Sequence, residues 1–140
     1  MTRYLDRTIK EIHAALIKNE VTPVQLVEEA IARIDRDTCN AFEAKAYKQA
    51  LKRAKQIKEV GVGDFLAGIP YLAKDNYSTK GIETTASSRI LEGYVPLFDA
   101  EVIRKLSRQK AILVAKTTMD ELAAVQKCTY DKLSRMFRAD

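Results

Sequence analysis

Hydrophobic residues recur at helical spacing over roughly the first sixty positions of the chain. Ile9, Ile12 and Leu16 form the first apolar stripe, and His13 flanks it. A stripe of the same kind predicts a third helix over about residues 44–58. With nothing nearby to complement its imidazole, His13 is interpreted as a residue at the edge of the buried stripe rather than a ligand.

The second helix has a strong start signal in the sequence. Thr22 is a natural N-cap, Pro23 suits the first helical position and Gln25 completes a capping box. Val21 and Leu26 stand at the two positions of a hydrophobic staple. These residues predict a helix that begins at residue 23.

The pattern changes after the glycines at residues 61 and 63, from helical spacing to short apolar runs separated by polar segments. The predicted order is a buried strand at residues 68–73, a long loop at residues 77–97, a helix at residues 99–109, a buried strand at residues 111–115 and a helix from about residue 119. Asp99 is the expected N-cap of the fourth helix, and Thr118 with Glu121 the expected capping box of the last. This order predicts an α/β fold: N-terminal helices, then strand, loop, helix, strand and helix, with parallel strands.

Chemistry in a parallel sheet gathers beyond the carboxyl ends of its strands, where Lys74 and Lys116 are expected. Lys74 is the sharper candidate, because an amine in a partly dry cleft loses its charge more easily and can act as a base. The alternative is a lysine that reaches water or pairs with Asp75. On position alone, that structural alternative is favoured.

Composition narrows the classes of function. Lys and Arg outnumber Asp and Glu by 24 to 19, and the net charge of +5 permits contact with RNA without requiring it. No apolar run is long enough to span a membrane, and residues 1–10 contain no signal-peptide core. With one histidine and two distant cysteines, Cys39 and Cys128, neither a Cys/His zinc site nor a Ser-His-Asp mechanism is expected.

Two further features have structural interpretations. Four lysines, at positions 45, 48, 52 and 55, follow one side of the third helix, where a solvated face is favoured over a nucleic-acid contact. Ser87 and Ser88 are interpreted as hydroxyls that satisfy the backbone of the loop.

Four segments, in order, resemble motifs of the amidase signature family, and most closely those of the A subunits of Glu-tRNA(Gln)/Asp-tRNA(Asn) amidotransferases. They are GIPYLAKDN at residues 68–76, TTASS at 84–88, LEGYVPLFDA at 91–100 and AKTTMDELA at 115–123. The resemblance covers about residues 8–123.

The resemblance implies a catalytic role for Lys74. In this family the triad is Ser–cis-Ser–Lys, and the lysine of the KDN motif is its base. The lysine deprotonates the bridging serine, which in turn activates the nucleophilic serine, and the family enzyme hydrolyses glutamine to ammonia. Lys74 is therefore the one catalytic residue carried over to this chain.

Both serines of the family triad lie in a Gly/Ser-rich segment of the GGSSGGS kind, which these 140 residues do not contain. The expected organisation is an N-terminal portion of an amidase signature domain at residues 1–125 and a divergent helical tail at residues 126–140. We expect a truncated homologue that is inactive alone. A binding module, half of a split amidase and a frameshifted product stay open as alternatives.

The resemblance also sets expectations about partners. The B and C subunits of the amidotransferase are the expected partners, glutamine the family substrate, and tRNA only an indirect one. No cofactor is expected in this chain, with ATP and Mg²⁺ acting at the partner protein. We expect a cytoplasmic location. With two strands whose edges are open, marginal stability or self-association is also expected.

Overall fold

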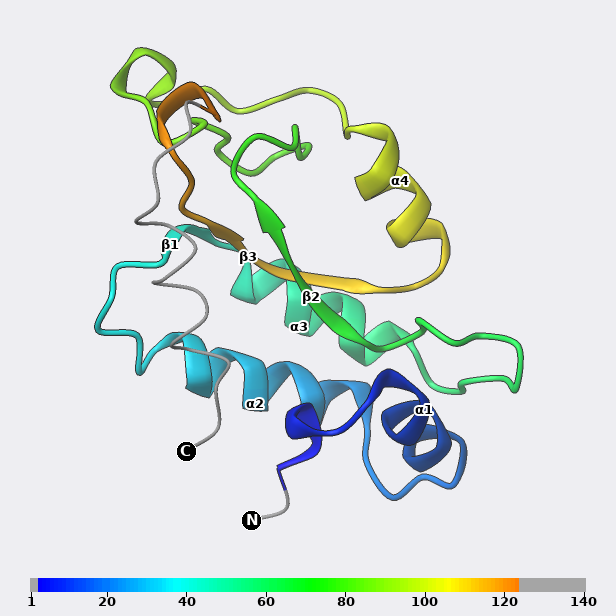
Figure 1. The fold of residues 1–140 in the computed structure, drawn as a ribbon. Coiled ribbons are helices and arrows are strands. Elements are labelled where there is room, and N and C mark those ends of the chain that lie inside the picture. The colour runs from blue at the N-terminus through cyan, green and yellow to red at the C-terminus, as the bar shows by residue number, and fades with distance from the viewer. Residues whose placement is uncertain (1–2, 124–140) are drawn as a thin grey trace.

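The computed structural model describes residues 3–123 of the chain (Figure 1). The helices are α1 (Ile9–Ile17), α2 (Pro23–Ile34), α3 (Tyr47–Gln56) and α4 (Glu101–Arg108), the strands are β1 (Phe42–Lys45), β2 (Pro70–Lys74) and β3 (Ile112–Thr117), and short 3-10 turns occupy Tyr4–Asp6, Arg89–Leu91 and Glu121–Ala123. The expected helical tail at residues 126–140 and Cys128 lie outside the described residues.

The start of α2 is as predicted. Thr22 Oγ1 accepts from the Gln25 backbone N–H at 3.2 Å, and Gln25 Oε1 accepts from the Thr22 N–H at 2.9 Å. Pro23 occupies the first turn, where a missing N–H costs nothing. The same reciprocal pair, Thr8 with Glu11, starts α1. Each box satisfies backbone donors that a helix terminus otherwise leaves unpaired.

The main core lies between α2, α3 and β3. It consists of Val27, Ala30, Ile34, Ala50, Ala54, Ile112, Val114 and Ala115. Small alanines on α3 let that helix approach the strand closely, and β3 is buried along nearly its whole length. A strand covered in this way has a continuous apolar run in its sequence, which is the pattern that predicted it.

The sheet has three strands in the order β1-β3-β2. β2 and β3 are parallel, as predicted, with α4 in the connection between them. β1 is antiparallel to β3 and was not predicted, since the third helix was expected to begin near residue 44. Pairing of Phe42 with Thr117, and the 2.9 Å bond from the Ala46 N–H to the Val114 carbonyl, extend the chain before α3 begins.

Two predicted caps are wrong. Asp99 Oδ1 accepts from the Lys80 N–H at 2.8 Å, and the residue that caps α4 is Ala100, without a side-chain bond. Thr118 Oγ1 has no hydrogen-bond partner among the described residues, so no capping box forms with Glu121. In both places a contact with the 77–97 loop replaces the expected local bond. Asp99 accepts from the backbone of Lys80, and Glu121 accepts from the hydroxyl of Ser88.

His13 is a buried structural residue rather than one at the edge of the stripe. Its Nε2 lies 3.0 Å from the Gly61 carbonyl, and its ring stacks on Phe65 with centroids 4.5 Å apart. The side chain is almost entirely buried, with an exposure of 5%. Across residues 3–123, none of the helices combines the length and apolar character that crossing a membrane requires.

The four lysines expected on one helical face do not share one element. Lys45 lies in β1 and pairs with Asp35 at 2.9 Å. Lys48, Lys52 and Lys55 lie on α3 and are exposed. This arrangement agrees with the solvated face that the sequence favoured.

Candidate active site

Lys74 is the last residue of β2, and its side chain is exposed. The backbone turns at once beyond it, because the Tyr77 N–H donates to the Lys74 carbonyl at 3.1 Å. The partly dry cleft expected around this amine is not formed by the described residues. Of the two structural alternatives, Lys74 reaches water, and Asp75 has a different partner.

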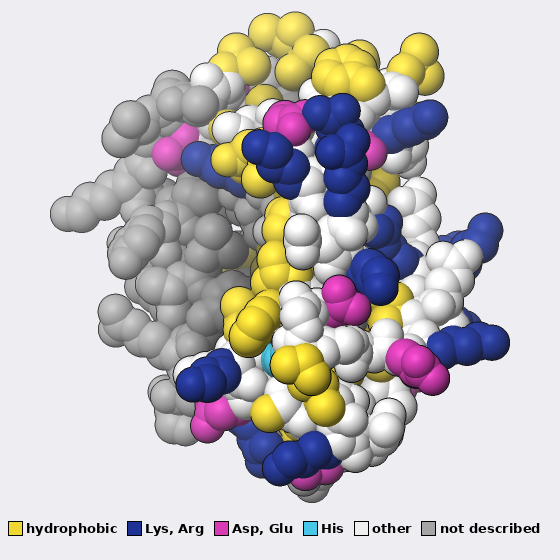
Figure 2. All heavy atoms as spheres, turned by 90° about the vertical axis from the view of Figure 1, so that its right-hand side faces the viewer, with side chains coloured by type: hydrophobic (Ala, Val, Ile, Leu, Met, Phe, Trp, Pro, Cys, Tyr) yellow, Lys and Arg dark blue, Asp and Glu magenta, His cyan; other side chains and the backbone are white. Residues whose placement is uncertain are grey.

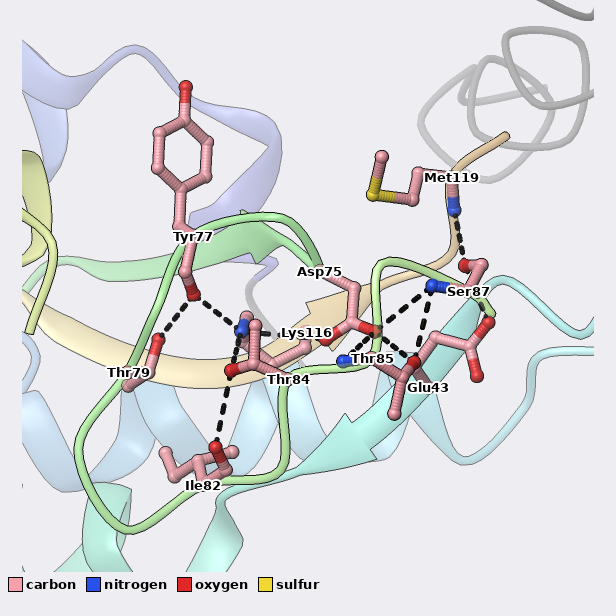
Figure 3. A network of polar contacts seen from close by, with 10 residues as sticks. All are labelled: Glu43, Asp75, Tyr77, Thr79, Ile82, Thr84, Thr85, Ser87, Lys116 and Met119. Carbon is pink, nitrogen blue, oxygen red and sulfur yellow. Dashed lines mark hydrogen bonds and ion pairs between the residues drawn. The ribbon is translucent and has the colours of Figure 1, made fainter. Parts of the chain in front are cut away.

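Asp75 points inward and is fully buried (Figure 3). Its Oδ2 accepts from the Thr85 N–H at 3.0 Å, from Thr85 Oγ1 at 2.6 Å and from the Ser87 N–H at 3.5 Å. Its own backbone carbonyl accepts from the Ala86 N–H at 3.1 Å. The carboxylate and the carbonyl of Asp75 therefore gather three successive loop residues around the end of β2.

Two of these loop residues have a backbone conformation that is costly for them. Ala86 and Ser87 have φ of 49° and 53°, in the left-handed region that favours glycine. Such residues cost about 1–3 kcal/mol each and persist where their surroundings over-determine them. Successive N–H groups in turns of this kind form a concave anion site, and the Asp75 carboxylate occupies it here.

Lys116 lies within β3, and its side chain is completely buried. Its Nζ donates to the Tyr77 carbonyl at 2.8 Å and to Thr84 Oγ1 at 3.0 Å, and it lies 3.5 Å from Asp75 Oδ1 (Figure 3). Burial lowers the pKa of Lys116, and the nearby Asp75 carboxylate opposes that shift. The desolvated lysine of this region is therefore Lys116 rather than Lys74.

Ser87 and Ser88 both hold the loop in place, in agreement with their structural interpretation. Ser87 Oγ donates to Glu43 Oε1 at 2.7 Å and accepts from the Met119 N–H at 3.0 Å. Ser88 Oγ donates to Glu121 Oε1 at 2.8 Å. Within residues 3–123, no hydrogen bond joins either hydroxyl to Lys74.

A hollow of about 300 Å³ lies beside this loop. It is lined by Glu43, Ala44, Glu83, Thr85, Ser87, Ser88, Arg89 and Glu92. Three of its side chains are glutamates, but in the part of the chain that the structure describes, no group of three His, Cys, Asp or Glu side chains is arranged to hold a metal ion. A larger hollow of about 510 Å³ separates α3 from α4.

The sequence predicted Lys74 and missed the pair formed by Lys116 and Asp75. A signal was present, since each charged residue follows an apolar run that was predicted as a strand. In adjacent parallel strands those two ends lie side by side, so a lysine at one and an aspartate at the other are candidates for an ion pair.

The model of the amidase family matches residues 25–134, most of the chain. The chain belongs to this family. The resemblance of the KDN, TTASS and MDELA segments to amidase signature motifs is thus confirmed at the level of the family.

Curated relatives and solved structures agree with this membership. The chain is 44% identical over 127 residues to the A subunit of the mitochondrial glutamyl-tRNA(Gln) amidotransferase of Ornithorhynchus anatinus, covering 85% of this chain and 24% of that protein. It is 39% identical to the corresponding protein of Oenococcus oeni, covering 88% and 26%. A peptide amidase from Stenotrophomonas maltophilia superposes with a TM-score of 0.76 at 27% identity, covering 85% of this chain and 26% of that enzyme. The chain therefore spans about a quarter of the length of the relatives it matches, and its α/β fold is a piece of the amidase fold.

Proposed function

We propose that this chain is the lysine-bearing part of the glutamine-hydrolysing A subunit of an amidotransferase, and that Lys74 is its base. The observation that carries the proposal is the position of Lys74, at the carboxyl end of a parallel strand in a segment similar to the amidotransferase relatives. In such a site the lysine takes a proton from a bridging serine, and that serine activates the nucleophile that attacks the glutamine amide.

The exposure of Lys74 bears on when it acts. A lysine amine acts as a base only in its neutral form. Covering Lys74 by the polypeptide that carries the serine pair would remove water from the amine and favour its neutral form. The proposal therefore includes two states: inactive alone, and competent once Lys74 is covered.

Ammonia release from glutamine tests this proposal. The purified chain alone is expected to release no more ammonia than its Lys74→Ala variant. Mixed with the part of a related amidotransferase A subunit that follows the matched region, the chain is expected to release ammonia, and Lys74→Ala is expected to abolish the release. Lys80→Ala, at an exposed lysine of the following loop, is the matched control.

Two results would contradict the proposal. Ammonia release by the chain alone, above the level of Lys74→Ala, would overturn the inactive state. Equal release by the complemented chain and its Lys74→Ala variant would overturn the role of the lysine as base.

We further propose the setting of this activity. Ammonia would pass to a partner protein that amidates Glu-tRNA(Gln) or Asp-tRNA(Asn), with ATP and Mg²⁺ acting at that partner and tRNA contacting this chain only indirectly. The names of the relatives, which are amidotransferase subunits from mitochondria and bacteria, support membership of such a complex. The B and C subunits are the proposed partners, and the bacterial relatives support a cytoplasmic site of action.

A second candidate function is that of a binding module without chemistry of its own. Exposed apolar side chains support it, and these gather in the loop before α4: Ile90, Tyr94, Val95, Leu97 and Phe98. Figure 2 shows hydrophobic side chains gathered at the upper end of the face that it draws. Co-purification with the B and C subunits, weakened by Leu97→Ser and not by Val62→Ser, would favour this function if ammonia release never depends on Lys74.

A further inference from the structure

The ion pair between Lys116 and Asp75 has no role in the proposed chemistry, yet both side chains are fully buried. Removing two charges from water is expensive, and apolar side chains of similar volume often serve stability as well or better. The pair therefore adds little to stability as such. Its contacts indicate what it does add.

Those contacts tie together segments that are distant in sequence (Figure 3). The Lys116 ammonium comes from β3 and holds the Tyr77 carbonyl at one end of the loop and Thr84 Oγ1 near the other. Asp75, directly after β2, holds Thr85 and Ser87. One buried pair thus closes the loop of residues 77–87 over the carboxyl ends of the two parallel strands.

The pair stabilises a loop segment with a strained backbone, at Ala86 and Ser87. Without the Asp75 carboxylate, the N–H groups of Thr85 and Ser87 would lose their charged acceptor, and the left-handed backbone would lose one of the contacts that offset its cost. Without Lys116, that carboxylate would be a buried charge with no counter-ion among residues 3–123. The loop conformation therefore depends on both members of the pair.

We propose that Lys116 and Asp75 are positioning residues, whose pair fixes the 77–87 loop and thereby the direction in which the chain leaves β2 at Lys74. The part of this inference that concerns catalysis rests on the proposed function of Lys74. The part that concerns the loop does not, because it follows from the contacts of the pair itself.

Amide hydrogen exchange in the ¹⁵N-labelled chain tests the loop. Lys116→Met removes the charge at similar length, and Asp75→Asn removes the other charge at constant size. Each is expected to speed exchange of the Tyr77, Thr85 and Ser87 amides by roughly tenfold more than exchange of the Ile112 amide, which bonds to the Ile69 carbonyl in the core. Lys105→Met, at an exposed lysine of α4, is the matched control and should change neither rate.

The double variant adds a second measurement. Asp75→Asn with Lys116→Met leaves no unpaired buried charge, so its loss of stability is expected to be smaller than the sum of the two single losses. Its loop amides are still expected to exchange faster than those of the wild type relative to Ile112. If Lys116→Met does not fold, this double variant alone decides the question.

If the variants speed amide exchange equally in the loop and in the core, the inference would be overturned. That result would mean that the pair affects the stability of the whole fold and has no specific effect on the loop. The catalytic part is tested in the complemented ammonia assay, where Lys116→Met is expected to lower kcat and leave the KM for glutamine nearly unchanged. A complemented assembly without Lys74-dependent release would overturn the proposed function, while the exchange rates would still decide the role of the pair.

Discussion

Two lysines near the ends of neighbouring strands have opposite environments, and the register of the sheet explains why. Ala73 is the partner of Lys116 in the parallel pairing, and Lys74 is the partner of Thr117. Successive residues of a strand point to opposite faces, so Lys74 and Lys116 leave the sheet on different sides. The sequence placed both near a strand end but held no information on this register.

Tyr71 provides a prediction at the same scale. Burial raises its pKa from 10.0 to about 12. When the pKa of a side chain is higher in the folded state than in the unfolded state, the group stabilises the fold at any pH below its unfolded-state pKa. This stabilisation is lost as the pH rises toward the folded-state pKa. The free energy of unfolding is therefore expected to fall between pH 10.0 and about 12, and Tyr71→Phe to remove part of that fall.

Urea unfolding at a series of alkaline pH values measures this effect. Tyr94→Phe, which removes the hydroxyl of a more exposed tyrosine, is the matched control. The lowered pKa of Lys116 makes the free energy of unfolding rise with pH up to pH 10.5. Because Lys116 is present in the wild type and in both variants, this contribution cancels in the comparison. Identical slopes for Tyr71→Phe and the wild type would contradict the prediction.

At the scale of elements, α1 and α2 begin at capping boxes made by residues close together in the sequence, whereas α4 begins without a side-chain cap. Thr22 and Thr8 form complete capping boxes with residues three positions away. Asp99 does not cap α4, because its carboxylate accepts a hydrogen bond from the backbone N–H of Lys80, 19 positions earlier. A cap can be predicted from sequence unless a distant donor competes for its side chain.

Thr22→Ala tests the contribution of the predicted cap of α2. The loss of the bond to the Gln25 N–H is expected to lower the free energy of unfolding by about 1 kcal/mol. Thr38→Ala, at an exposed threonine without a capping role, should change it by less than about 0.5 kcal/mol. Thermal and urea unfolding measure both, and equal losses would show that the cap contributes nothing.

Gly68 joins α2 to the start of β2 through a close approach. Its φ is +77°, and a Cβ there would stand 2.8 Å from Pro23 Cγ, in the first turn of α2. Gly68→Ala is expected to lower the free energy of unfolding by about 1–3 kcal/mol through backbone strain and overpacking. Gly63→Ala, where a Cβ meets nothing within 4 Å, should leave it unchanged or slightly higher. A harmless Gly68→Ala would contradict this packing.

At the scale of the whole molecule, the described part of the chain resembles one portion of a larger domain. In the sheet order, β1 and β2 each have a neighbour on one side only, and apolar side chains of the 89–98 loop face water. Open strand edges and apolar patches favour association with other chains. The peptide amidase that superposes on this chain is a longer polypeptide, of which the chain covers 26%.

Self-association is the corresponding prediction. The sedimentation coefficient of the purified chain is expected to rise with concentration, and Leu97→Ser, at an 87% exposed leucine, to reduce that rise. Val62→Ser removes a similarly exposed side chain outside the loop and should have little effect. A monomer at all concentrations, with a sharp melting transition independent of concentration, would contradict the prediction.

The sequence by itself determined the α/β order, the cap of α2, the two parallel strands and the place of Lys74, because these depend on neighbours a few positions away or on apolar periodicity. Only the tertiary structure decided that residues 42–45 form a strand, that Lys74 is exposed and that Lys116 pairs with Asp75. Those outcomes depend on contacts between residues far apart in the sequence, such as Lys116 with Thr84, 32 positions apart, and Phe42 with Thr117 in the pairing of β1 with β3. Local propensity does not predict such contacts, because they form only when segments distant in the sequence pack together.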